Sequence, residues 1–163
     1  QDGESIALDA STTALYMARH LRGRKEITVI TNSLRIAEEI ANYPGLTVVL
    51  PGGLIRPAAM SVVGDWSAAV LNQINIGKAF VGARGLTLTE GLTDVDSEEV
   101  KLKQALVAAA REVIAIIDHT KWGQVGLATF CPIDHVHRVI TVRSAPRDLV
   151  QNIRQHGIEV TLV

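Results

Sequence analysis

The sequence has almost no cysteine and no long hydrophobic run, and each shortage excludes a class of protein. Cys131 is the single cysteine, so no disulfide forms within the chain and no cysteine-based metal cluster is possible. A reducing compartment, the cytoplasm, is therefore the expected location. No apolar stretch approaches the roughly 20 residues of a membrane-spanning helix, and the chain does not start like a signal peptide, so we expect no membrane partner.

The chain also lacks an excess of charge of either sign, since its formal net charge is -1. Domains that bind nucleic acid usually have a basic face, so this chain alone is not expected to bind DNA. Hydrophobic residues make up 47% and charged residues 20%, which is typical of a folded protein rather than a disordered one. We expect one domain over residues 1–163. Because the first residue is Gln1 and not Met, we also expect a piece of a longer protein.

Short β-rich runs alternate with helical patterns along the whole chain. This alternation predicts an α/β fold with a mostly parallel sheet and helices on both faces. Two of the runs are apolar without alternation, as buried parallel strands are. The predicted strands are Ser5–Leu8, Ile27–Ile30, Leu46–Leu50, Lys78–Val81, Val113–Ile117, Val136–Val142 and Ile158–Val163. The predicted helices are Thr12–Leu21, Leu34–Ala41, Trp66–Ile74, Ser97–Ala110 and Pro146–His156.

Small, hydroxyl or charged residues follow each of the first five predicted strands. In open parallel sheets, ligands bind beyond the carboxyl ends of the strands, so these five loops predict a pocket. The first loop is the most informative and contains Asp9, Ser11, Thr12 and Thr13. A helix that begins there would direct free backbone N–H groups and its positive end at an anion such as a phosphate. The competing interpretation, that Ser11 or Thr12 only caps the helix, is equally compatible with the sequence.

The other loops contain further candidates for ligand contact, each with a plain structural alternative. The second loop could hydrogen-bond sugar hydroxyls or phosphate oxygens, or could only cap a helix. Glycines in the third and fourth loops could let backbone approach a ligand, or could serve turns and tight packing. The candidates are Thr31, Asn32 and Ser33, then Gly52 and Gly53 with Arg56, then Gly82, Arg84 and Gly85.

Charged residues later in the chain complete the candidate site. Lys121 follows the most apolar strand, where a lysine suits a phosphate, although it could also be a solvated surface residue. Asp94 precedes a long helix on which Glu99 and Lys103 stand four residues apart, as an ion pair or as two pocket residues. Ser97 is a plausible cap for that helix, whose first turn is acidic. His135 and His137 share a strand face but have no evident third ligand, so no metal or cofactor is expected.

In this order, these residues resemble the C-terminal effector-binding domain of the DeoR family of bacterial transcriptional regulators. The resemblance covers nearly the whole chain, and the joint order is far more specific than any single motif. It departs at Ser11, where the family usually has Gly, at Ala14, where a further Thr is common, and at Val142, where the family commonly has Asp. The matching segments are residues 8–13, 31–33, 52–53 with Arg56, 80–85, 91–94, Glu99 with Lys103, and 118–121.

The resemblance implies a Rossmann-like fold similar to that of sugar-phosphate isomerases, with a phosphorylated sugar or related metabolite as effector. It also implies that a winged helix-turn-helix domain, absent from these residues, binds operator DNA, and that the protein is a homo-oligomer. Two hypotheses follow. The leading one is a sensor of a sugar phosphate, held by residues 11–13 and Lys121, with Thr31, Asn32, Asp94 and Glu99 as candidates for its hydroxyls.

The alternative hypothesis is a sugar-phosphate isomerase on the same scaffold. Such an enzyme needs a positioned carboxylate base. Ribose-5-phosphate isomerases, which the implied fold resembles, have acidic residues after the corresponding strand, where this chain has Gly82-Ala83-Arg84-Gly85. Asp94, Asp96, Glu98 and Glu99 remain possible bases, so the sequence favours sensing without excluding catalysis.

Overall fold

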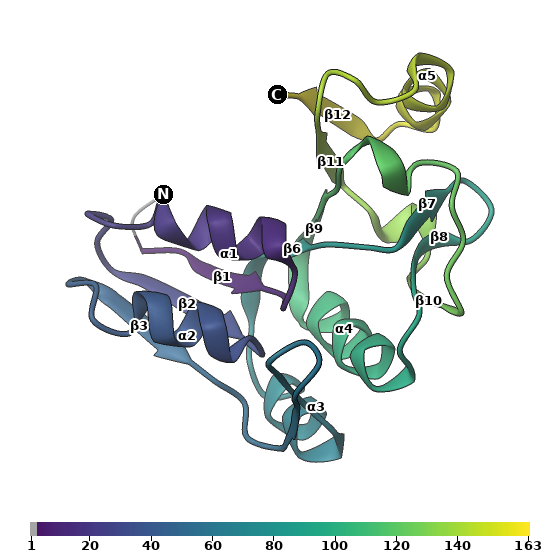
Figure 1. The fold of residues 1–163 in the computed structure, drawn as a ribbon. Coiled ribbons are helices and arrows are strands. Elements are labelled where there is room, and N and C mark those ends of the chain that lie inside the picture. The colour runs from purple at the N-terminus through teal and green to yellow at the C-terminus, as the bar shows by residue number, and fades with distance from the viewer. Residues whose placement is uncertain (1–2) are drawn as a thin grey trace.

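A sheet of seven parallel strands forms the centre of the molecule in the computed structural model, which describes residues 3–163 (Figure 1). The predicted mostly parallel sheet is confirmed, and each of the seven predicted strands is present with ends that differ by a few residues. In spatial order, the strands are β12 (Glu159–Leu162), β11 (Arg138–Thr141), β9 (Ala110–Ile116), β6 (Ile76–Val81), β1 (Ser5–Leu8), β2 (Ile27–Thr31) and β3 (Leu46–Val49).

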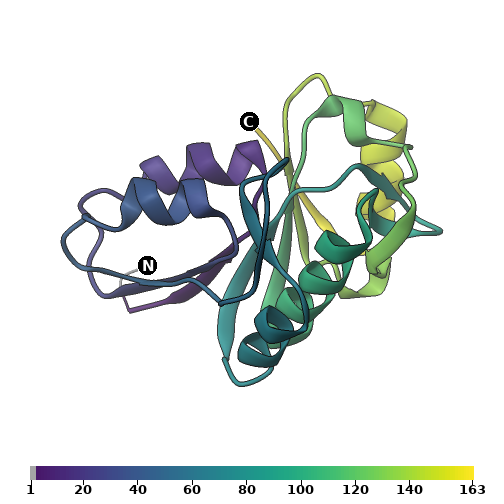
Figure 2. The same cartoon turned by 60° about the horizontal axis from the view of Figure 1, so that its bottom comes forward.

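Helices cover both faces of this sheet, as the alternation predicts (Figures 1 and 2). On one face, α1 (Thr12–Arg19) and α2 (Leu34–Ile40) bury small and branched apolar residues against the strands. On the other face lie α3 (Asp65–Leu71), α4 (Ser97–Ala109) and α5 (Arg147–Gln155). The described chain contains no helix long and apolar enough to cross a membrane.

Side-chain caps fix where three of these helices begin. Ser11 Oγ accepts a hydrogen bond from the Ala14 N–H at 3.2 Å, and Ser33 Oγ accepts one from the Ile36 N–H at 3.2 Å. The predicted cap of α4 is wrong, because Asp96 and not Ser97 precedes the helix with extended backbone. The Asp96 carboxylate reaches two free N–H groups at once, which a serine hydroxyl at the next position does not.

Two small antiparallel elements interrupt the parallel sheet and were not predicted. A hairpin of β4 (Leu54–Arg56) and β5 (Ser61–Val63) lies between β3 and α3. A three-stranded sheet combines β7 (Gly85–Thr87), β8 (Gly91–Asp94) and β10 (Ala128–Cys131). Short 3₁₀ turns, η1 (His119–Lys121) and η2 (Ile133–His135), complete the fold. These strands have only three or four residues each, which is too few for an alternation of apolar and polar residues to be recognised in the sequence.

The order of the strands reverses between β1 and β6. The chain runs outward from β1 through β2 to β3 and then returns to β6 on the other side of β1. The segment after β1 leads into α1 on one face, whereas the segment after β6 leads to α4 on the other. In open α/β sheets, such a switch point leaves a crevice at the carboxyl ends of the strands, where ligands bind.

Candidate functional site

A cavity of about 410 Å³ lies at this switch point, which is within the usual size range of small-molecule sites. The pocket predicted at the carboxyl edge is therefore present, although the loops after β2 and β3 do not line it. The hairpin and the start of α4 take their place. The lining consists of residues 10–13, 82–84, 94–96 and 116–118, with Arg56, Ala59, Glu99, Lys103 and Lys121.

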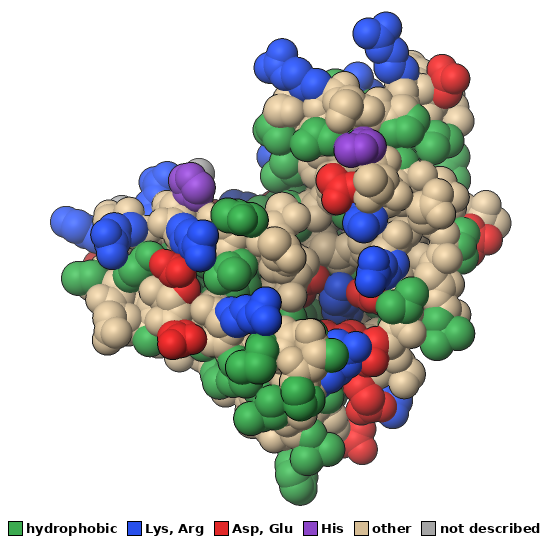
Figure 3. Space-filling view, viewed as in Figure 1, with side chains coloured by type: hydrophobic (Ala, Val, Ile, Leu, Met, Phe, Trp, Pro, Cys, Tyr) green, Lys and Arg blue, Asp and Glu red, His purple; other side chains and the backbone are tan. Residues whose placement is uncertain are grey.

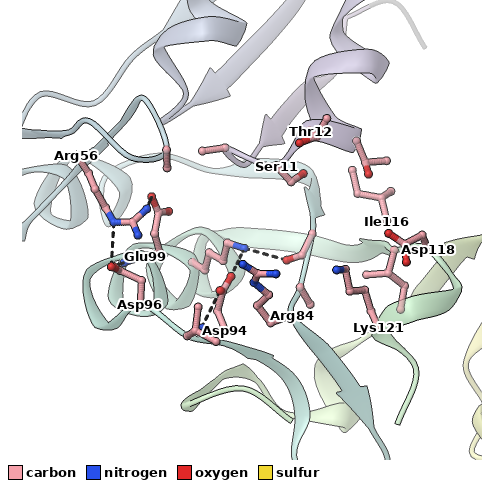
Figure 4. Close-up of a pocket in the computed structure, with 18 residues that line it drawn as sticks. Ser11, Thr12, Arg56, Arg84, Asp94, Asp96, Glu99, Ile116, Asp118 and Lys121 are labelled. Carbon is pink, nitrogen blue, oxygen red and sulfur yellow. Dashed lines mark hydrogen bonds and ion pairs between the residues drawn. The ribbon is translucent and has the colours of Figure 1, made fainter. Parts of the chain in front are cut away.

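The start of α1 forms one wall of the cavity (Figure 4). Ser11 Oγ is occupied by the Ala14 N–H, and the Leu15 N–H bonds to the Ser11 carbonyl. The N–H groups of Thr12 and Thr13 therefore have no acceptor within the helix. Both threonines are exposed, so this helix start offers two N–H groups and two hydroxyls to a ligand.

Asp9 is fully buried and organises this wall from behind. Its Oδ1 accepts a hydrogen bond from the Ser11 N–H at 3.1 Å, and its Oδ2 accepts one from the Gly82 N–H at 2.8 Å. A side chain at Gly82 would also collide with Ser11, because an added Cβ would lie 2.7 Å from Ser11 Cβ. The Asp9 carboxylate thus joins the ends of β1 and β6 at the switch point.

Lys103 on α4 holds the floor of the cavity together. Its Nζ lies 3.0 Å from Asp9 Oδ2 and 2.7 Å from Asp94 Oδ2, and it donates a hydrogen bond to the Gly82 carbonyl at 2.9 Å. Burial alone would lower the pKa of Lys103, but the charges of Asp9 and Asp94 outweigh it, so the pKa of Lys103 is raised. Lys103 is therefore a charged structural centre that pairs with these aspartates and not with Glu99.

Carboxylates and a guanidinium from two elements meet at the far end of the cavity (Figure 4). Arg56 on β4 donates to Asp96 Oδ2 at 2.9 Å and lies 3.8 Å from Glu99 Oε1. Glu99 also accepts hydrogen bonds from Ser61 on β5 and, at 3.3 Å, from Asn32. The Glu99 N–H, with help from Arg56, holds the pKa of Asp96 below its ordinary value despite partial burial. Arg56 is thus largely neutralised by its neighbours.

Two further cations line the cavity without such partners. Within residues 3–163, neither Arg84 nor Lys121 has a carboxylate oxygen within the 4.0 Å of an ion pair. Both side chains point toward the middle of the cavity from the side opposite Ser11 and Thr12 (Figure 4). The Thr120 hydroxyl and then the charge of Lys121 contribute to a lowered pKa of Asp118. The cavity therefore contains two cations that are available to an anionic ligand.

Ten of the seventeen candidate residues line the cavity, and the structure places the other seven behind it or away from it. Asp9, Thr31, Asn32 and Ser33 are buried and hold the surrounding backbone or side chains by hydrogen bonds. The remaining three are glycines. Gly52 accepts a hydrogen bond from Ser67, Gly53 adopts a φ of 151°, and Gly85 lies directly against Gln124.

Some lining residues lie outside the candidate set derived from the sequence. Asp96, named from the sequence only as a possible base of an isomerase, is the most important of them. Its position three residues before Glu99 is the spacing of a helix cap, which is a signal present in the sequence. Asp118 belongs to the loop after β9, which is one of the five loops that the sequence predicts to form the pocket. Ala59 and Val95 have no polar group that would mark them in the sequence. They line the cavity because of the path that the hairpin and the loop before α4 follow in the fold.

The described residues contain no group of three or more His, Cys, Asp or Glu side chains placed to hold a metal ion. His137, one of the two histidines considered for such a role, accepts a hydrogen bond through Nδ1 from the Val113 N–H at 3.1 Å. That nitrogen is therefore used within the fold.

The fold, an α/β fold with an open parallel sheet, is similar to that of a sugar-phosphate isomerase of known structure. Over 78% of this chain and 48% of the other, the structure is similar to ribose 5-phosphate isomerase from Plasmodium falciparum, with a TM-score of 0.52. The sequence identity is 16%, so this similarity concerns the fold alone.

The chain belongs to the family of DeoR C terminal sensor domains, whose model matches residues 1–143. It is 32% identical to the HTH-type transcriptional regulator GolR of Listeria innocua and to the HTH-type transcriptional regulator IolR of Bacillus subtilis, each over 99% of this chain. It is 28% identical over 98% of its length to the HTH-type transcriptional repressor GlcR of Bacillus subtilis. The chain spans 61–64% of the length of these relatives.

Proposed function

We propose that this chain senses a phosphorylated sugar for a transcriptional regulator and thereby changes the binding of that regulator to operator DNA. The family membership supports a sensor of a regulator, and the relatives named as regulators or repressors extend well beyond the matched region. In this proposal the operator is bound by a helix-turn-helix domain outside these residues, in the cytoplasm, and the regulated genes serve sugar metabolism.

The observation that carries the proposal is a pair of cations that form no ion pair within residues 3–163 and lie across from a helix start. Arg84 and Lys121 face Thr12 at the start of α1 (Figure 4), and the N–H groups of Thr12 and Thr13 lack intrahelical acceptors. N–H groups at a helix start together with cations are a recurrent phosphate site. We assign the phosphate of the ligand to this end of the cavity.

The opposite end of the cavity suits the hydroxyl groups of a sugar. Asp94, Asp96 and Glu99 present carboxylate oxygens there, and Arg56 presents guanidinium N–H groups. Carboxylate oxygens accept hydrogen bonds from the hydroxyl groups of a sugar, and guanidinium N–H groups donate hydrogen bonds to the hydroxyl oxygens. We expect Thr31 and Asn32 to act on the sugar only through the neighbours they hold, because both are buried and hydrogen-bonded within the fold.

Effector binding changes DNA binding only if the two states of the regulator differ in affinity for the ligand. In a homo-oligomer, that difference shifts the population between DNA-competent and DNA-released arrangements. The cavity is formed by four separate segments and the hairpin, so a ligand that contacts several of them favours one arrangement of these segments over another.

An isomerase on the same scaffold is the alternative function. The turn after β6 contains Arg84 but no carboxylate. Each carboxylate that lines the cavity has a structural partner: Asp94 pairs with Lys103, Asp96 with Arg56, Glu99 with Ser61 and Asp118 with Thr120. Glu98, the other possible base, does not line the cavity. Because these contacts hold the carboxylates in place, the geometry supports sensing better than proton transfer.

We expect one or two sugar phosphates to raise the melting temperature of the chain in a thermal-shift screen, while the matching free sugars do not. A ligand at about 100 times its Kd stabilises the native state by about 2.7 kcal/mol, or roughly 5–10 °C for a chain of this size. Losing one charge-assisted hydrogen bond in Lys121→Met should weaken binding roughly 10- to 100-fold.

Lys101→Met is the matched control, because Lys101 is an exposed lysine that lines no part of the cavity. Its thermal shift with ligand should equal that of the wild-type chain. Equal stabilisation of Lys121→Met and wild type would contradict the phosphate assignment. Conversion of the aldose phosphate to its ketose by the purified chain would instead establish the isomerase alternative.

A further inference from the structure

A group of exposed apolar side chains covers the β4–β5 hairpin and the neighbouring face of α3. Trp66 is 73% exposed, Leu54 is 65% exposed and Ile55 is 60% exposed, and Met60 and Val70 are also more than a third exposed. Figure 3 shows apolar side chains gathered over this region of the molecule. We call these five side chains the hairpin patch. Exposed apolar side chains gathered in one region of a folded protein mark an interaction site.

The hairpin patch lies in the part of the sequence with the least charge. Residues 46–77 contain two charged side chains, Arg56 and Asp65, although charged residues make up 20% of the chain. The guanidinium of Arg56 faces the cavity, where Asp96 binds it, and so leaves the patch without a cation. Depletion of charge together with enrichment in Trp and Met is the composition of the core of a protein–protein interface.

The fold itself does not account for the apolar residues of β4. Leu54 and Ile55 are consecutive in a strand, so they point to opposite faces, yet both are exposed. Only β5 is buried, and a two-stranded hairpin contributes little stability alone. Within the described residues, β4 pairs with β5 and with no other strand, so its outer edge offers unpaired N–H and C=O groups.

We propose that the hairpin patch is the interface between two copies of this chain, related by a two-fold axis near Ile55. An unpaired strand edge pairs with itself in the antiparallel sense about such an axis, which puts the central residue of the three-residue strand opposite its own copy. Leu54, Met60 and Trp66 then surround this contact with apolar area. The five side chains of the patch are uncharged and the nearest exposed charge in the sequence is Asp65, which does not favour a nucleic acid, whereas an apolar surface is complementary to a second copy of itself.

Sedimentation equilibrium of the purified chain tests this interface. The wild-type chain should associate to dimers at micromolar concentration, and the double variant Ile55→Glu/Trp66→Glu should weaken the association roughly 100-fold or more, because it puts like charges across the axis. Leu127→Glu is the matched control, since Leu127 is 74% exposed but lies outside the patch, and it should associate like the wild type. Circular dichroism should show that all three chains are folded.

Disulfide formation by Ile55→Cys tests the position of the axis independently. Paired strands hold opposing Cα atoms about 4.5–5.5 Å apart, which suits a disulfide between the two copies. The native Cys131 does not interfere, because it is buried and burial raises the pKa of its thiol to about 12. Rapid cross-linking of Ile55→Cys, but not of Leu127→Cys, is the expected result.

Three results would overturn the proposal. They are a wild-type chain that stays monomeric up to about 100 µM, a dimer that Ile55→Glu/Trp66→Glu leaves intact, and cross-linking no faster at position 55 than at position 127. The first would point to a different partner for the hairpin patch, and the second to a dimer formed by another surface. None of these results depends on the ligand of the cavity.

Discussion

Lys103→Met is expected to lower the free energy of unfolding by about 3–5 kcal/mol, because it leaves two carboxylates at the cavity floor without their cation. Asp9 is fully buried and Asp94 is mostly buried, and Lys103 Nζ is within 3.0 Å of both. Methionine retains the length and apolar stem of lysine, so the loss reports the charge and not a hole in the core. The Gly82 carbonyl loses its hydrogen bond as well.

Urea titration followed by circular dichroism measures this loss, and a melting temperature lower by about 10 °C should accompany it. The control is Lys101→Met on the same helix, because the Lys101 side chain is 62% exposed and forms its ion pair with Glu98 on the surface. It should change the free energy of unfolding by less than about 0.5 kcal/mol. If the two variants lost the same amount, Lys103 would not be the structural centre inferred from its contacts.

The same contacts predict a dependence of stability on alkaline pH. The pKa of Lys103 is raised above its ordinary value of 10.5 in the folded state. Its contribution is therefore fully present below pH 10.5 and is lost as the pH rises through the raised folded-state pKa. As the pH rises above 10.5, the wild-type chain should lose more stability than Lys103→Met, which has no such group to titrate. Parallel curves would contradict this assignment.

Gly85→Ala is the second substitution with a large expected effect, a loss of about 3 kcal/mol. An added Cβ would lie 1.9 Å from the Gln124 carbonyl oxygen and 2.9 Å from Thr93 Oγ1. Because the Gln124 atom belongs to the backbone, the loop after η1 must move to relieve the overlap. Gly85 begins β7 directly after Arg84, so the displaced backbone also shifts a cation of the cavity.

Thermal and urea unfolding of Gly85→Ala should be compared with those of Gly52→Ala. An added Cβ at Gly52 has no atom within 4 Å and the residue lacks a left-handed φ, so this change should be close to neutral. Both glycines follow strands of the main sheet in the sequence, but only Gly85 is expected to be required for packing. Similar stability of the two variants would contradict the close approach of Gln124.

The parallel sheet could be predicted from the sequence because its strands are separate apolar runs that alternate, for most of the chain, with helical patterns. The strand Val113–Ile117 is apolar throughout, since both of its faces are covered by helices. The short antiparallel strands could not be predicted in the same way. Segments such as Leu54–Arg56 are too short for a period, and their pairing depends on distant residues.

The candidate site was predictable where a residue follows a strand next to the switch point. The loop after β1, which includes Ser11 and Thr12, is such a case. The loop after β2 does not line the cavity, because its side chains turn into the protein. There the Thr31 hydroxyl accepts a hydrogen bond from the Ser33 N–H, and the Ser33 hydroxyl accepts one from the Ile36 N–H at the start of α2. A sequence shows which loops reach the same edge of a sheet, but not toward which side of that edge each side chain turns.

The position of Arg56 gives the β4–β5 hairpin a mechanical connection to the cavity. The inner side of the hairpin is tied to the start of α4 through Arg56 with Asp96 and through Ser61 with Glu99, and both carboxylates also line the cavity. A ligand that hydrogen-bonds these carboxylates competes with the ties that hold the hairpin. A ligand that displaces these two contacts can therefore alter the position of the hairpin and of the apolar surface on its outer side.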